Sequence, residues 1–128
     1  MKKIILSFLA GMGLCSSCAS GKDIKVLAPE AFISAAKADS SAVILDVRKP
    51  EEFAGGHVKG AVLLNVLDET AFNEGLGKLD KSRHYYVYCR SGKRSHAAAE
   101  KMVEQGFTVY DMEGGFLNWT SRGLPVEK

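Results

Sequence analysis

The chain has 128 residues, of which 46% are hydrophobic and 25% charged, as in one ordinary globular domain. Its formal net charge is +2, from 17 Lys and Arg against 15 Asp and Glu, and Lys2 and Lys3 account for the excess. No basic stripe indicates nucleic-acid binding, and no cluster of His, Cys, Asp or Glu has the spacing of metal ligands. We therefore predict no nucleic-acid partner, no metal and no other cofactor.

Residues 1–17 have the pattern of a secretory signal peptide, with a positive start and an apolar run, 4–14, that is too short for a permanent membrane anchor. Cys15 and Cys18 form a Cys-x-x-Cys arrangement, which elsewhere indicates a redox pair. Here the pair ends an export segment rather than following a strand. The segment resembles a bacterial lipoprotein signal with cleavage before Cys18, although Cys15 stands where that signal usually has an aliphatic residue.

This interpretation predicts a lipoprotein on the periplasmic face of a bacterial membrane, anchored by lipid on Cys18. Residues 18–23 would be a tether and 24–128 the folded domain, and a soluble periplasmic protein is the alternative. Cleavage removes Cys15 in either case. With Cys18 lipidated, Cys89 is the remaining free thiol in an oxidising compartment, so an intramolecular disulfide is excluded and a functional thiol is favoured.

Short strands alternate with helices along the rest of the chain. The expected strands are 24–27, 42–45, 61–64, 85–88 and 108–112, and the expected helices are 30–38, 49–54, 68–79, 95–105 and 116–119. The continuous apolar strands 42–45 and 61–64 indicate burial on both faces. This order predicts a single α/β domain, with a central parallel sheet and helices on both faces. Ligands in such sheets bind at the carboxyl ends of strands, where Asp46, Cys89 and Met112 are placed.

A short loop between the strand 85–88 and the following helix carries the strongest chemical signal. Its cysteine faces unpaired backbone amides and the positive end of the helix dipole. Three cations surround it, and all these effects favour the thiolate, so we expect a nucleophilic cysteine near neutral pH. The alternative is a buried structural cysteine with cations nearby by chance. The loop consists of Cys89, Arg90, Ser91, Gly92, Lys93 and Arg94.

Several motifs, taken in order, resemble those of a rhodanese domain. They are LDVR at 45–48, PEEF at 50–53, GHVKGA at 56–61, YCRSGKRS at 88–95 and GGFLNW at 114–119. The resemblance covers about residues 24–125. Lys59 departs from it, because many relatives have proline there.

The resemblance implies a sulfurtransferase of the thiosulfate sulfurtransferase type. Cys89 would take a sulfane sulfur from a small anionic donor, thiosulfate or a polysulfide, and pass it as a persulfide to a thiol or cyanide. The amides of 90–94 would surround the outer sulfur, and Arg90 and Lys93 would attract the donor. Lys93 is alternatively a solvated surface lysine. Arg94 either closes the loop, binds the donor or pairs with the scaffold. The acceptor protein stays open, and we expect a monomer.

The remaining motif residues favour structural roles. Asp46 and Arg48 are expected to pair with each other or with nearby backbone. His57 is expected to make fixed hydrogen bonds, because an ionised cysteine needs no general base. Trp119 is expected to anchor the last helix in the core, and the role of His96 stays open.

Three other functions compete with the enzyme. The first is a persulfide carrier that delivers sulfur to a partner protein, and the sequence does not distinguish this carrier from the enzyme. An idle binding module is disfavoured because Cys89 and its loop are intact. A cysteine phosphatase or arsenate reductase is disfavoured by loop length, since four residues separate Cys89 from Arg94 and those enzymes have five before their arginine.

Overall fold

The computed structural model describes residues 23–128. The signal peptide, the lipidation of Cys18 and all of the tether except Asp23 lie outside these residues, so they stay predictions. Within the described residues, no helix is long and apolar enough to cross a membrane.

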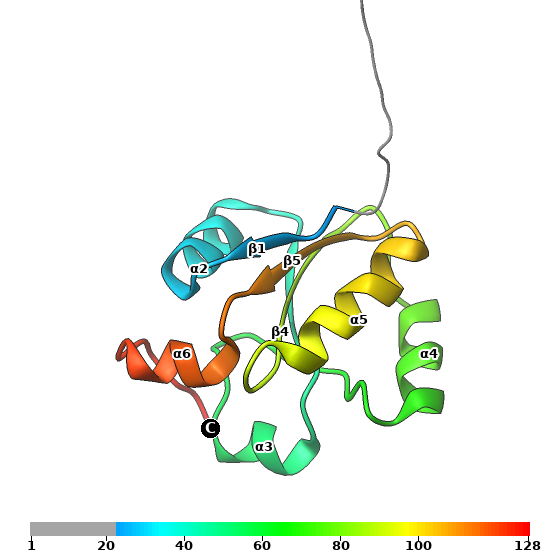
Figure 1. Ribbon diagram of the computed structural model, residues 1–128. Coiled ribbons are helices and arrows are strands. Elements are labelled where there is room, and N and C mark those ends of the chain that lie inside the picture. The colour runs from blue at the N-terminus through cyan, green and yellow to red at the C-terminus, as the bar shows by residue number, and fades with distance from the viewer. Residues whose placement is uncertain (1–22) are drawn as a thin grey trace, which may run out of the picture.

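The domain is built on five parallel strands in the order β1-β5-β4-β2-β3. Strand β4 lies at the centre and pairs with both β2 and β5. The predicted α/β domain with a central parallel sheet is therefore confirmed (Figure 1). The strands are β1 (Lys25–Leu27), β2 (Ala42–Asp46), β3 (Val62–Leu63), β4 (His84–Tyr88) and β5 (Thr108–Met112).

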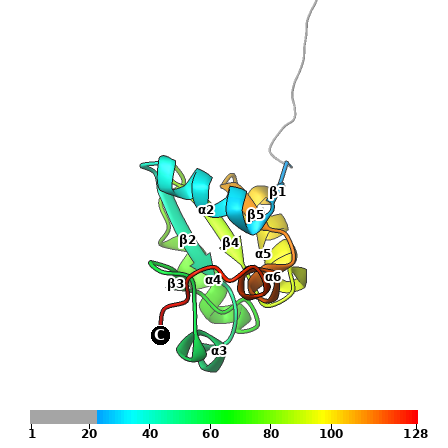
Figure 2. The ribbon, with the colours of Figure 1, turned by 90° about the vertical axis from the view of Figure 1, so that its left-hand side faces the viewer.

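Helices cover both faces of this sheet, as Figures 1 and 2 show. One core cluster joins the sheet to α4 and α5, and a second joins it to α2 and α6. Helix α3 lies near α6, beyond the carboxyl ends of the strands (Figure 1). The helices are α2 (Pro29–Ala38), α3 (Pro50–Gly55), α4 (Glu69–Gly77), α5 (Lys93–Glu104) and α6 (Gly115–Ser121).

Strand β4 supplies both cores because successive side chains of a strand point to opposite faces. Tyr85, Val87 and then Cys89, just beyond the strand, belong to the cluster under α4 and α5. Tyr86 and Tyr88 belong to the cluster under α2 and α6. The central strand therefore delivers Cys89, which is 0% exposed, to the carboxyl edge of the sheet beside the start of α5.

The prediction of a third strand buried on both faces was wrong. Strand β3 is only Val62–Leu63, and the side chain of Val62 is 52% exposed. The physical reason is its place at the sheet edge, where β2 is its one neighbour among the strands of residues 23–128. Leu64, just after β3, packs instead near α4, where a Cβ on Gly75 would lie 2.5 Å from the Cδ1 atom of Leu64.

Helix α5 begins at Lys93, two residues before the predicted start at Ser95. Ser95 is fully buried, and its hydroxyl donates to the Asp111 carboxylate on β5, at 2.6 Å. The N-cap is Gly92, whose φ of 104° is a left-handed conformation that favours glycine. Lys93 and Arg94 thus stand in the first helical turn. Cations are unfavourable for the helix there, because the positive end of the dipole repels them, but they add to the attraction of that end for an anion.

The core under α4 and α5 should depend on Phe72, which is 0% exposed. We expect Phe72→Ala to lower the free energy of unfolding by about 3–5 kcal/mol, since a large cavity replaces the ring. Leu67, which is 59% exposed, provides the matched control. Leu67→Ala should change stability by less than about 0.5 kcal/mol in the same urea titration. Equal midpoints for the two variants would contradict this account of the core.

Candidate active site

The sulfur of Cys89 is held inside the turn that precedes α5. The amide of Gly92 donates to Sγ at 3.1 Å. The first amides of α5 have no acceptor within the helix, and they begin at Lys93, next to this contact. A negatively charged sulfur is stabilised by such amides and by the positive end of the helix dipole. The turn is therefore an anion cradle built around one sulfur atom.

The start of α6 fixes the other side of the cradle. The amide of Phe116 donates to the carbonyl of Cys89 at 2.8 Å, and the amide of Leu117 donates to the carbonyl of Arg90 at 3.0 Å. Gly115 has a φ of 62°, and a Cβ there would lie 2.6 Å from the carbonyl of Arg90. Only glycine lets α6 approach this closely. The carbonyls of Cys89 and Arg90 accept hydrogen bonds from α6, so the peptide groups that follow these two residues have a fixed orientation.

A buried ion pair supports the strand ends beneath Cys89. Arg48 donates to Asp46 from Nε at 2.9 Å and from Nη2 at 2.7 Å, and both residues are buried. The Tyr88 hydroxyl donates to the same carboxylate at 2.7 Å and accepts from the amide of Val58 at 3.0 Å. Burial and the Asp46 charge raise the pKa of Tyr88. Burial is the largest single influence on Arg48 and acts to lower its pKa, but the hydrogen bonds to Asp46 and the neighbouring negative charges together raise the pKa of Arg48.

The sequence suggested two kinds of contact for Asp46 and Arg48, a pair with each other and a bond to nearby backbone. The structure contains both. Nη2 of Arg48 also donates to the carbonyl of Gly56 at 2.7 Å. Its guanidinium lies 4.4 Å from the ring centroid of Phe116. The pair therefore ties β2 to the loop before β3 and to α6. Both carboxylate oxygens of Asp46 already accept hydrogen bonds from Arg48 and Tyr88, so Asp46 is not free to act as a base.

Arg94 pairs with the scaffold, one of its predicted alternatives. It donates to both carboxylate oxygens of Glu52 on α3, at 2.8 and 3.0 Å. The two side chains are 22% and 21% exposed. The hydrogen bonds from Arg94 lower the pKa of Glu52 to about 2, and the same bonds raise the pKa of Arg94. The pair is therefore fully charged at neutral pH and spans from α3 to the first turn of α5.

The other loop side chains face solvent. Arg90, Ser91 and Lys93 are exposed, and Gly92 is half-buried. In the part of the chain that the structure describes, no carboxylate lies within 4.0 Å of the Arg90 or Lys93 side chain. These two residues are therefore the unpaired positive charges beside the cradle.

His57 and His96 occupy different settings. His57 is buried, its Nδ1 lies 3.0 Å from the carbonyl of Phe53, and its ring stacks on that of Phe53. Its backbone also pairs with that of Glu127 through two hydrogen bonds of 2.8 Å. His96 is 51% exposed, and its Nδ1 lies 3.6 Å from the carboxylate of Asp111. His57 thus links α3 to the C-terminal segment, whereas His96 lies at the surface of α5.

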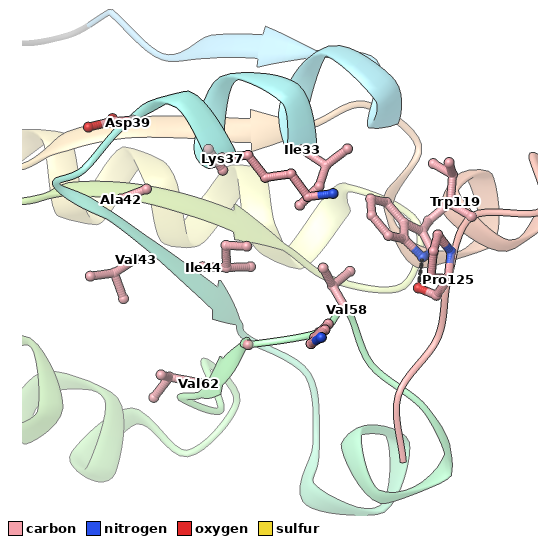
Figure 3. A pocket seen from close by; sticks show the side chains of 14 residues that line it. Ile33, Lys37, Asp39, Ala42, Val43, Ile44, Val58, Val62, Trp119 and Pro125 are labelled. Carbon is pink, nitrogen blue, oxygen red and sulfur yellow. Dashed lines mark hydrogen bonds between the residues drawn. The ribbon is translucent and has the colours of Figure 1, made fainter.

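A largely apolar groove in residues 23–128 lies away from the cradle, beside α2 and the β2–β3 edge (Figure 3). Its volume is about 540 Å³, and its walls include Ile33, Ile44, Val58 and Trp119. None of its lining residues belongs to the loop 89–94. Trp119 is 2% exposed and donates to the carbonyl of Pro125 at 2.9 Å, as a core anchor of α6 would. Among the described residues, no three His, Cys, Asp or Glu side chains gather as metal ligands do.

Four residues that shape the site were given no role from the sequence: Glu52, Tyr88, Ser95 and Asp111. The first three lie within the motifs quoted above. Glu52 carried a signal as the third residue of a short helix, where it also accepts from the amide of Lys49 at 3.1 Å. The pairing of Glu52 with Arg94, 42 positions apart, had no local signal. Burial raises the pKa of Asp111, against the hydrogen bond from Ser95 that lowers it.

Together, the parallel sheet and the cysteine at a helix start define a single-domain α/β protein with a cysteine-centred anion cradle. The chain belongs to the rhodanese-like domain family, whose family model matches residues 29–122.

Similar proteins agree with this assignment. The thiosulfate sulfurtransferase GlpE of Stutzerimonas stutzeri is 36% identical over 98 residues, which are 76% of this chain and 85% of that protein. A crystal structure of a rhodanese-related protein from Thermoplasma volcanium has a TM-score of 0.71 at 27% identity, covering 80% of this chain and 97% of that one. A rhodanese-like domain protein from Staphylococcus aureus has a TM-score of 0.69 at 26% identity, covering 82% and 100%.

Replacing Gly115 should disturb the cradle. We expect Gly115→Ala to lower the free energy of unfolding by about 1–3 kcal/mol, because its Cβ meets backbone atoms at a positive φ. Gly77→Ala is the control, since a Cβ there has no atom within 4 Å and alanine favours a helix. Urea titrations of both variants check this. Equal stability of the Gly115 variant and the parent would show that α6 does not fix the loop.

The Glu52–Arg94 pair should contribute stability that depends on pH. The pKa of Glu52 is about 2 in the folded protein, below its usual 4.5, so the contribution is complete above about pH 4.5 and is lost as pH falls through 2. We expect Glu52→Gln to be less stable than the parent at pH 7, with the difference shrinking toward pH 2. Urea titrations at several pH values measure it. A difference that grows on acidification would contradict the assigned sign.

Proposed function

We propose that the protein is a sulfurtransferase that moves sulfane sulfur from thiosulfate or a polysulfide to a thiol or cyanide. The observation that carries the proposal is the contact of the Gly92 amide with Cys89 Sγ at the amino end of α5. The chain's membership of the rhodanese-like domain family and its similarity to a protein named thiosulfate sulfurtransferase support it.

In the first half-reaction, the Cys89 thiolate attacks the outer sulfur of thiosulfate. The S–S bond of the donor breaks, its electron pair leaves with sulfite, and Cys89 carries a persulfide. The amides of the cradle then stabilise the charge on the terminal sulfur. In the second half-reaction, a thiolate or cyanide attacks that sulfur, and the Cys89 thiolate leaves. No proton needs to move in either step, in keeping with the structural contacts of His57.

The geometry of Arg94 argues against the phosphatase alternative. A phosphate ester is gripped by an arginine whose two donors are free to form a fork with two phosphate oxygens. Both terminal nitrogens of Arg94 are already bonded to Glu52. The cradle is also one residue shorter than in cysteine phosphatases. Both features support sulfur rather than phosphoryl transfer.

The persulfide carrier is the second candidate, because Cys89 is 0% exposed. A buried persulfide is protected from bulk solvent and would suit transfer to a docked partner. A carrier would use the same cradle around Cys89 as the enzyme. The two candidates differ in turnover with small acceptors. We further propose, on sequence alone, that the chain acts as a monomer and is exported and held at a membrane by lipid on Cys18.

Persulfide formation tests the proposal directly. Residues 23–128 contain the whole sheet domain and one cysteine, Cys89. We expect the intact mass to rise by one sulfur after thiosulfate, and cyanide to reverse the gain. Cys89→Ser should show no gain and should lose sulfur transfer entirely.

Rapid conversion of cyanide to thiocyanate would identify the enzyme, and a single turnover would identify the carrier. Retained sulfur transfer in Cys89→Ser would refute the assignment. So would the absence of a mass gain with thiosulfate, polysulfide and organic persulfides alike.

A further inference from the structure

The charges around the cradle do not all remain available to a donor. Arg48 is matched by Asp46, and Arg94 is matched by Glu52, each through two or more hydrogen bonds. Of the positive side chains nearby, Arg90 and Lys93 have no carboxylate within 4.0 Å among residues 23–128. A site built only to attract anions would leave Arg94 free as well.

The position of Glu52 is fixed rather than accidental. Its Oε1 accepts from the amide of Lys49 at 3.1 Å and from Arg94 at 2.8 Å, while Oε2 accepts from Arg94 at 3.0 Å. Both partners are about four-fifths buried, so water screens their charges only in part. Arg94 is also close enough to Cys89 for a negative sulfur to raise the pKa of the Arg94 guanidinium, after the larger effect of Glu52.

We propose that Glu52 is a specificity-determining residue, which neutralises Arg94 beside the cradle and so reduces the preference for doubly charged donors. This inference rests on the proposed function. Coulomb energy is proportional to the charge of the donor, so removing the Glu52 charge changes the binding of a dianion twice as much, in free energy, as that of a monoanion. A merely structural role of Glu52 would affect both donors alike.

Two sulfane donors with the same reacting sulfur allow the comparison. Thiosulfate is a dianion and benzenethiosulfonate a monoanion, and each gives thiocyanate with cyanide. In a two-step transfer, kcat/KM for the donor reports only the first half-reaction, so the acceptor does not affect it. We expect Glu52→Gln in the full chain to raise kcat/KM about fivefold for thiosulfate and about twofold for benzenethiosulfonate. Glutamine keeps an acceptor for the Lys49 amide. Both increases should shrink at high salt.

Glu51→Gln is the matched control, because it removes the same charge from the same helix. Glu51 is exposed and makes no ion pair among the described residues, so its replacement should change both values by less than about 1.5-fold. If the Gln variant of Glu52 unfolds, Glu52→Ala replaces it, since alanine favours a helix.

Equal factors for the two donors, a fall in either value, or the same effect from Glu51→Gln would each overturn the inference. A parent protein that loads sulfur from neither donor would instead refute the proposed function, and the inference with it. A parent that turns over both donors, with no difference between them in Glu52→Gln, would refute the inference alone.

Discussion

The site depends on one buried carboxylate. Asp46 is 0% exposed and accepts hydrogen bonds from the guanidinium and amide of Arg48 and from the hydroxyl of Tyr88. A buried charge is tolerated only when it is paired and hydrogen-bonded, and here each oxygen has partners. Since Tyr88 is the residue before Cys89, the same carboxylate that joins β2 to β4 also positions the nucleophile. The guanidinium of Arg48 extends this connection to α6 through the face of Phe116.

Above this ion pair, backbone groups rather than side chains form the cradle around the Cys89 sulfur. The start of α6 binds the carbonyls of Cys89 and Arg90, and the left-handed Gly92 turns its amide toward the sulfur. Backbone dipoles held in this way need no reorganisation when charge develops on a sulfur, which is the condition for electrostatic stabilisation of a reacting group. The nearby cationic side chains act on the approaching donor rather than on the bound sulfur. Those of Arg90 and Lys93 remain unpaired within the described residues, and they offer a field that attracts anionic donors.

Much of this arrangement could be predicted from sequence. The alternation of strands and helices predicted the parallel sheet, and the loop motif predicted a cysteine facing amides at a helix start. Predictions were poorer where a tertiary contact outweighed a local pattern. The apolar run 61–64 indicated a buried strand, but its position at the sheet edge left Val62 exposed. Ser95 has the side chain of a helix cap, but it is buried against Asp111, and the helix begins at Lys93 instead.

Local spacing in the sequence was enough to identify the residues whose chemistry is local: Cys89, Gly92, the cations beside them, and Gly114 and Gly115 at the start of α6. Adjacent residues share a turn whatever the rest of the chain does, so their spacing carries the information. Which charges stay unpaired depends instead on how the whole domain folds. Glu52 and Arg94 are 42 positions apart, and their pairing depends on how α3 and α5 meet beyond the sheet. Sequence spacing does not encode that distance, because it is set by the packing of the whole domain.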